Sequence, residues 1–215
     1  MDYQAKHGYR DPQGVEEYVQ RRFRGIFGKY RYRIEQSAVK AVCRHMAKAA
    51  TIADVPCGIG RWWAALAPFA REVRGFDLSP TMVTVASRLA RASDVPISVE
   101  CANAECLPLT NESVDYVFCF ALFKHLPVPL QYQVLKEFSR VCSRGVIISY
   151  RRHISWSYPF HLIRNRDNER RTASRVLDTH FEHMVDHAGL NIVEQRRCSS
   201  PFGVEYVAFL RKCQD

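Results

Sequence analysis

The chain has 215 residues and a mass of 24.8 kDa, a length that predicts one domain with enough residues to bury a substantial core. Apolar residues make up 47% of it and charged residues 25%, with ten Gly and ten Pro, which excludes collagen-like, disordered and low-complexity chains. No uncharged apolar run reaches the roughly 18 to 20 residues of a membrane span, and the polar N-terminus lacks the apolar stretch of a secretory signal, so we expect a cytoplasmic protein.

The eight cysteines include no CxxC pair. In a reducing compartment we expect free thiols, and because most of them lie in apolar segments, we interpret them as small core residues. The absence of CxxC and CxxxCxxC spacing argues against a zinc ribbon and an iron–sulfur cluster. We therefore expect no metal.

The net charge of +9 is concentrated in two segments. Residues 1–50 hold 11 Lys and Arg against 5 Asp and Glu, and residues 140–171 hold 8 against 2. The first segment interleaves arginines with Phe27, Tyr30 and Tyr32, and the second contains Arg151 and Arg152. Such segments form either a solvated basic face or a contact surface for phosphate, carboxylate or nucleic acid, depending on whether they meet in space.

The predicted elements begin with amphipathic helices at Val15–Gly28 and Ser37–Ala50. From Thr51 onward, short β-rich runs alternate with helical patterns, which is typical of βαβ units and a parallel sheet. Helices are also predicted at Arg61–Arg71, Leu130–Val141 and Thr172–Gly189. A further helix is predicted to begin at Ser79-Pro80, where Ser79 can cap it and Pro80 occupies the first turn. The predicted strands are Thr51–Pro56, Val73–Asp77, Ile97–Cys101, Val114–Phe120, Gly145–Tyr150, Asn191–Gln195 and Val204–Arg211. The order predicts a basic, aromatic helical arm, residues 1–36, before one doubly wound α/β domain, residues 37–215.

A glycine turn follows the first predicted strand, at the place where an open α/β sheet binds its ligand. Gly58 and Gly60 allow close backbone approach, and Asp77 ends the next strand, where its carboxylate can accept hydrogen bonds from a ribose diol. Dinucleotide binding requires a third glycine at position 63, which is Trp, and no Gly-Lys-Ser/Thr phosphate loop is present. The pattern favours a nucleoside cofactor without phosphates.

From about residue 40 to 211 the chain resembles the class I S-adenosylmethionine-dependent methyltransferase family, in its type 11-like form. Asp54–Gly60 is similar to the family's D-x-G-x-G-x-G turn, with Pro56 in place of the first glycine, and Asp77–Met82 is similar to its D-x-S-x-x-M segment. Asn103–Leu109 resembles the D-A-x-x-L-P-F loop, with Asn for Asp, and Phe120–Leu126 resembles the segment after the fourth strand. The resemblance implies a Rossmann-like, seven-stranded, mostly parallel sheet with an antiparallel last strand, and S-adenosylmethionine as the cofactor.

The resemblance also implies residue roles at the matching positions. Asp77 would hold the ribose, Met82 would lie near the adenine, and the segment from Phe120 would close over the methionine half of the cofactor. Arg61 is either a partner for the cofactor's carboxylate or a surface residue, and Cys57 is assigned to packing in the cofactor turn. The expected cofactor residues are Asp54, Pro56, Cys57, Gly58, Gly60, Arg61, Asp77, Leu78, Met82, Asn103, Ala104, Glu105, Phe120 and Ala121.

Methyl transfer from a sulfonium needs mainly proximity and orientation, so a dedicated base is optional. His125 and His153 are the candidate catalytic bases for a hydroxyl or amine acceptor, since imidazole titrates near neutrality; the alternative is that both are loop residues. The helical spacing of His180, His183 and His187 is compatible with a metal site or with an exposed helix flank.

The acceptor is expected to be an anionic small molecule, such as a phosphorylated or carboxylated metabolite or a lipid-linked sugar, methylated on O or N. The D/N/S-P-P-Y/F/W motif of amino-methylating nucleic-acid enzymes is absent after the fourth strand, where the sequence is Phe120–Phe123. The alternatives are an RNA methyltransferase, with arginines on phosphates and aromatic side chains stacked on bases, and a non-catalytic cofactor-binding partner subunit. The candidate substrate residues are Arg24, Tyr30, Arg31, Arg151 and Arg152.

Overall fold

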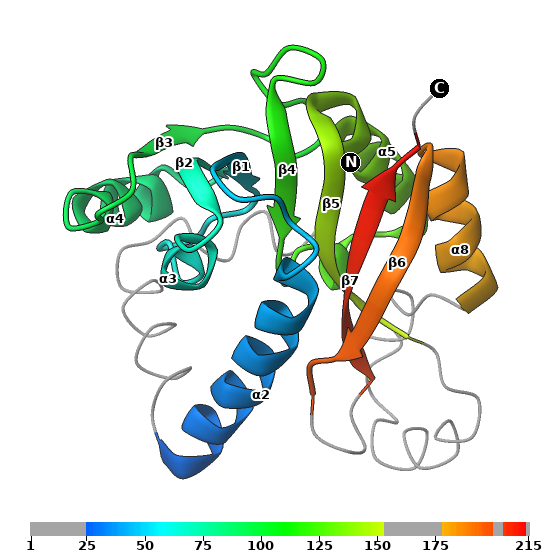
Figure 1. The fold of residues 1–215 in the computed structure, drawn as a ribbon, viewed down its shortest axis with the longest axis horizontal. Helices are drawn as coiled ribbons and strands as arrows, with labels where there is room; N and C mark the ends of the chain where they lie inside the picture. The colour runs from blue at the N-terminus through cyan, green and yellow to red at the C-terminus, as the bar shows by residue number, and fades with distance from the viewer. Residues whose placement is uncertain (1–24, 153–177, 200–203, 214–215) are drawn as a thin grey trace.

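The structure, a computed structural model, describes residues 25–152, 178–199 and 204–213. Within these residues seven strands form one sheet in the order β3-β2-β1-β4-β5-β7-β6 (Figure 1). Every pairing is parallel except the two made by β7, which confirms the α/β class, the seven strands and the antiparallel last strand. The strands are β1 (Ala50–Asp54), β2 (Ala70–Asp77), β3 (Ile97–Cys101), β4 (Val114–Cys119), β5 (Cys142–Arg151), β6 (Leu190–Arg197) and β7 (Glu205–Lys212).

Helices cover both faces of the sheet. On one face lie α2 (Gly25–Cys43), α3 (Trp63–Leu66) and α4 (Pro80–Ala90), and on the other lie α5 (Val128–Val141) and α8 (Asp178–His187). Figure 1 shows α4 beside β3 at one edge and α8 beside β6 at the other. None of the helices in the described ranges has the length and apolar character that crossing a bilayer requires.

The alternation of side chains along each strand explains this two-sided core. In β1, Ile52 packs with Val39 of α2, and the next residue, Ala53, belongs to the cluster that contains Leu135 of α5. All five residues of β1 are buried, as in central strands covered on both faces. Because β1 pairs in parallel with both β2 and β4, the carboxyl ends of these three strands meet at one edge of the sheet, and the glycine turn follows β1 there.

The helices predicted before residue 50 have the wrong bounds. Most of Val15–Gly28 lies outside the described residues, and α2 continues without a break from Gly25 to Cys43, across the expected boundary between residues 36 and 37. The second prediction placed a helix end at Ala50, but that residue opens β1 by donating its N–H to the Phe69 carbonyl. The helical spacing of apolar residues continues to Met46, which is buried but lies in the turn after α2, and for this reason the helix was predicted to extend too far.

The helix predicted at Arg61–Arg71 is also wrong. Only Trp63–Leu66 is helical, and β2 begins at Ala70. Pro68 has no N–H with which to extend the helix, and Ala70 pairs with Ala50 of β1. Of the helix predicted at Thr172–Gly189, residues 172–177 lie outside the described part of the chain, and the rest corresponds to α8. Gly189 follows α8 with a left-handed φ of 69°, as is typical of the glycine after a helix.

The eight cysteines are free, as expected. The interpretation of all of them as core residues is correct for the five buried thiols but wrong for Cys101, Cys106 and Cys213, which are exposed. Cys101 ends the edge strand β3, and Cys106 lies in the loop that follows it.

Gly145 lets β5 approach β7 closely. A Cβ at this position would lie 2.2 Å from the carbonyl oxygen of Leu210, and that backbone atom is held in the sheet. We expect Gly145→Ala to destabilise the protein by about 3 kcal/mol, the upper end of overpacking costs, which lowers the melting temperature by roughly 6 to 12 °C. Thermal and urea denaturation test this. A matched Gly189→Ala, where no atom lies within 4 Å of the added Cβ, should cost only about 1 kcal/mol for its left-handed φ, and an equal loss in both variants would contradict the close-approach argument.

Candidate functional site

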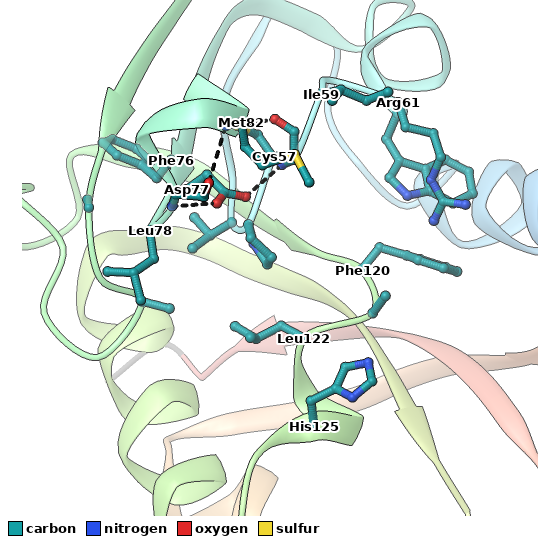
Figure 2. Close-up of a pocket in the computed structure, with 18 of the residues that line it drawn as sticks. Cys57, Ile59, Arg61, Phe76, Asp77, Leu78, Met82, Phe120, Leu122 and His125 are labelled. Carbon is teal, nitrogen blue, oxygen red and sulfur yellow. Dashed lines mark hydrogen bonds between the residues drawn. The ribbon is translucent and has the colours of Figure 1, made fainter. Parts of the chain in front are cut away.

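A cavity lies where β1, β2 and β4 end (Figure 2). Its walls come from the glycine turn after β1, the end of β2, the loop after β3 and the segment after β4, which includes the short 3-10 helix η2 (Phe123–His125). Figure 2 shows Cys57, Asp77 and Met82 on one side of the cavity and Phe120 and His125 on the opposite side. Of the expected site residues, those lining it are Pro56, Cys57, Gly58, Arg61, Asp77, Leu78, Met82, Asn103, Ala104, Phe120, Ala121 and His125.

Three expected cofactor residues do not line the cavity: Asp54, Gly60 and Glu105. Asp54 ends β1 directly before the lining residue Val55, and its carboxyl is buried. Burial raises the pKa of this carboxyl well above its usual range. At Gly60, whose φ is +80°, the Trp63 ring occupies the space that a Cβ would need, so this glycine allows the turn to pack against the ring.

Two backbone groups fix the Asp77 carboxylate at the cavity wall. The N–H of Gly58 donates to Oδ2 and the N–H of Ser79 donates to Oδ1, both at 2.9 Å. Ser79 also caps α4, since its Oγ accepts from the Met82 N–H at 3.3 Å. Burial raises the pKa of Asp77, and the two N–H groups oppose that increase. The side chain thus joins the glycine turn to the start of α4, and each oxygen has acceptor capacity beyond one bond.

The backbone of Gly58 borders open space. Its φ is +55°, a conformation that L side chains rarely adopt, and no atom lies within 4 Å of the position where a Cβ would stand. A ligand can therefore approach the main chain here without meeting a side chain.

Arg61 is held by a buried ion pair that the sequence did not indicate. Its Nη1 donates to Oε2 of Glu35 on α2 at 2.9 Å, and Glu35 is 1% exposed. The guanidinium also lies 4.5 Å from the Trp62 ring centroid and 5.1 Å from that of Phe120, within cation–π range. The surface interpretation of Arg61 is therefore wrong, since only 9% of its side chain is exposed.

The two basic segments meet in space at Glu205, the first residue of β7. Arg31 of α2 donates to Oε2 of Glu205 at 3.3 Å, and Arg151, the last residue of β5, donates to Oε1 at 3.3 Å. Arg152 lies over the Tyr206 ring at 5.4 Å, and Tyr30 is 55% exposed on α2. None of these four side chains lines the cavity. Arg24 and His153, the other candidates, lie outside the described residues.

Sequence analysis missed Glu35, Lys124 and Glu205. Lys124 lines the cavity and its Nζ donates to Glu205 Oε1 at 2.9 Å. Although burial raises the pKa of Glu205, the charges of Lys124, Arg31 and Arg151 outweigh it and lower that pKa to about 2. In the sequence, the only feature that pointed to any of the three was the position of Glu35, which is the first acidic residue after the basic segment Arg21–Arg33.

The histidines of α8 lie away from this cavity. Nδ1 of His183 and the hydroxyl of Tyr132 are 2.9 Å apart, and the His183 and His187 rings stack at 6.4 Å, while His180 is exposed. In the ranges that the structure describes, no three His, Cys, Asp or Glu side chains gather in a way that could hold a metal ion.

The middle of the chain, residues 52–145, matches a family model described as a methyltransferase domain. Over 101 residues the chain is 36% identical to a demethylmenaquinone methyltransferase of Bacillus licheniformis, which covers 46% of this chain and 42% of that one. Over 78 residues it is 32% identical to a ubiquinone biosynthesis O-methyltransferase of Coxiella burnetii, covering 36% of this chain and 33% of that one. The matches thus span about a third to two fifths of the length of these curated relatives.

The fold has solved counterparts. A crystal structure of magnesium protoporphyrin IX methyltransferase from Synechocystis PCC 6803, with bound S-adenosylhomocysteine, superimposes with a TM-score of 0.78. The alignment covers 97% of this chain and 98% of that one at 16% sequence identity, a level at which the likeness shows the fold.

Proposed function

We propose that the chain is a class I S-adenosylmethionine-dependent methyltransferase and that it transfers a methyl group from S-adenosylmethionine to an O or N atom of an anionic small molecule; the match to a methyltransferase-domain model and the likeness of the fold support this proposal. The observation that carries this proposal is the cavity at the ends of β1, β2 and β4, where Asp77, held by two backbone N–H groups, faces the open backbone of Gly58. This is the position at which an open α/β sheet binds its ligand.

The residues present fit such a cofactor. Asp77 has the acceptor atoms for a ribose diol. The space beside the Gly58 backbone is open, since no atom lies within 4 Å of the place where a Cβ would stand, so a ligand can approach the main chain there. Arg61, on the cavity wall, is the residue we assign to the cofactor's carboxylate. Asp54 does not line the cavity, and its role in cofactor binding stays a prediction from the sequence. The cofactor would supply a methyl group already activated on a sulfonium.

We assign the role of general base to His125, because it lies on the cavity wall across from Asp77 (Figure 2). Cys57 is not a nucleophile in this scheme, since burial raises the pKa of its thiol and keeps it protonated at neutral pH. Arg31 and Arg151 support an anionic acceptor, because both pair with Glu205, and Glu205 also pairs with the cavity residue Lys124. Arg152 and Tyr30 are assigned to the outer part of the same substrate surface, and the binding roles of Arg24 and His153 stay predictions from the sequence.

The test begins with calorimetry of S-adenosylmethionine and S-adenosylhomocysteine at two salt concentrations. We expect micromolar binding of both that changes little with salt, followed by transfer of a labelled methyl group to a member of a panel of acidic small molecules. Transfer to RNA, with RNA binding that weakens steeply with salt, would replace the small-molecule acceptor by the RNA alternative. Tight cofactor binding without turnover on either panel would favour the partner-subunit alternative, and no cofactor binding by folded protein would overturn the proposal.

A further inference from the structure

One carboxylate, Glu205, gathers three cations from three other elements. Lys124 of η2 lies 2.9 Å from it, and Arg31 of α2 and Arg151 of β5 lie 3.3 Å from it. The contacts join residues 81, 174 and 54 positions apart, so the cluster exists only in the folded chain. In Figure 1, β5 and β7, which carry Arg151 and Glu205, are neighbouring strands of the sheet, and α2, which carries Arg31, contacts β7.

The cluster is continuous with the cavity. Lys124 is part of the cavity wall, and Arg31 also contacts Glu35, the carboxylate that holds the cavity residue Arg61. Within this network four cations therefore meet two carboxylates. Since Glu205 keeps a pKa of about 2, its carboxylate is ionised at neutral pH and is already shared among three positive groups.

Part of the cluster is open to solvent. The side chains of Arg31 and Arg151 are 53% and 26% exposed, whereas that of Glu205 is 15% exposed. The two arginines are thus more accessible than the acid between them, whereas the side chain of Lys124, at 10%, is less exposed. A fold-stabilising ion pair needs only one cation per carboxylate, and three cations around a single carboxylate repel one another. An additional anion beside Glu205 would relieve that repulsion.

The neighbouring wall of the cavity is apolar. Phe120 and Leu122 lie on the same side of the cavity as His125, away from Asp77 (Figure 2), and Trp62 packs against Phe120 with ring centroids 4.5 Å apart. An acceptor with an aromatic or other apolar body and an acidic group matches this combination of an apolar wall and an adjacent cationic cluster.

We propose that Lys124, Arg31 and Arg151 form an anion subsite for an acidic group of the acceptor, a carboxylate or a phosphate, and that Glu205 sets the affinity of this subsite by competing for the same cations. This inference rests on the proposed function, because it takes the cavity to hold the cofactor and the acceptor together. It assigns Lys124 and Glu205 to substrate selection. Removing the charge of Lys124 should weaken binding of an anion, and removing the charge of Glu205 should strengthen it.

The experiment uses the full chain saturated with S-adenosylhomocysteine, so that the cofactor's own carboxylate already occupies its site. Phenyl phosphate, benzoate and neutral phenol are titrated by calorimetry. We expect the two anions to bind at least about tenfold more tightly than phenol, since a hydrogen bond to a charged group contributes that much or more. The tighter of the two anions distinguishes a phosphate from a carboxylate acceptor.

Three variants separate recognition from folding. Lys124→Gln should weaken anion binding about tenfold, whereas Glu205→Gln should strengthen it several-fold, because the competing carboxylate is gone. Arg74→Gln is the matched control, since it removes the same charge from a residue of β2 whose partner is Glu72, outside the cavity. It should leave anion binding unchanged.

Each outcome has a consequence. Unchanged or weaker anion binding in folded Glu205→Gln would show that the cations only anchor β7, and equal binding of phenol would show that the charges do not select the ligand. If Glu205→Gln does not fold, Arg151→Gln replaces it and should weaken anion binding as Lys124→Gln does, with unchanged binding overturning the inference. Failure of the wild type to bind S-adenosylhomocysteine would contradict the proposed function, whereas cofactor binding without anion binding would contradict the subsite alone.

Discussion

Replacing Asp77 by alanine should remove measurable binding of S-adenosylmethionine. The carboxylate is fixed by the Gly58 and Ser79 N–H groups at 2.9 Å each, and in the proposed complex its two oxygens also accept the ribose hydroxyls. Hydrogen bonds to a charged group contribute about 1.5 to 3 kcal/mol each, so the loss of two corresponds to at least about a hundredfold weaker binding. Calorimetry with S-adenosylmethionine and S-adenosylhomocysteine measures the effect directly.

Two further variants control for folding and charge. Asp77→Asn keeps the shape of the side chain and one acceptor oxygen, so its affinity should lie between those of the wild type and Asp77→Ala. Glu72→Ala removes the same charge from the same strand, but its carboxylate pairs with Arg74 outside the cavity, and binding should be unchanged. Wild-type affinity in a folded Asp77→Ala protein would place the ribose elsewhere.

Replacing Gly60 by alanine should destabilise the protein by about 2 to 5 kcal/mol. A Cβ at Gly60 would lie 2.3 to 2.6 Å from three atoms of the Trp63 ring, and the φ of +80° adds the cost of a left-handed conformation. Trp63 is 6% exposed and belongs to the buried cluster of Cys57, Val73 and Ala86, so its ring has little room to move away. Overpacking contributes about 1 to 3 kcal/mol and the left-handed conformation about 1 to 2 kcal/mol, which corresponds to a fall in melting temperature of roughly 4 to 20 °C.

Gly58→Ala is the matched variant in the same turn. It has a similar φ of +55° but no atom within 4 Å of the added Cβ, so its stability loss should be limited to about 1 to 2 kcal/mol. Its methyl group would occupy the open space into which we place the cofactor, and binding of S-adenosylhomocysteine should weaken strongly. Denaturation and calorimetry on both variants test the separation. Equal destabilisation by the two substitutions would show that the Trp63 contact does not matter.

Much of the fold follows from local patterns in the sequence. All seven strands lie where β-rich runs predicted them, with ends that differ by a few residues, because buried strands require continuous apolar segments and their turns require Gly, Ser and Pro. The helix bounds were less reliable. The apolar period continued through the turn after α2, where Met46 is buried without being helical, and the pattern after Gly60 continued past Pro68.

The sequence by itself determined the succession of strands and helices along the α/β chain and the glycine turn after β1, because Gly58, Gly60, Asp77 and Ser79 act through backbone conformation and bonds between neighbouring segments. Only the tertiary structure decided that Glu35 holds Arg61 and that Lys124, Arg31 and Arg151 meet at Glu205. Ion-pair partners have no required spacing along a chain, so composition revealed two basic segments but not the single carboxylate that brings them together. Their geometry depends on the packing of α2 and on the pairing of β7 with β5, which are set by the whole core.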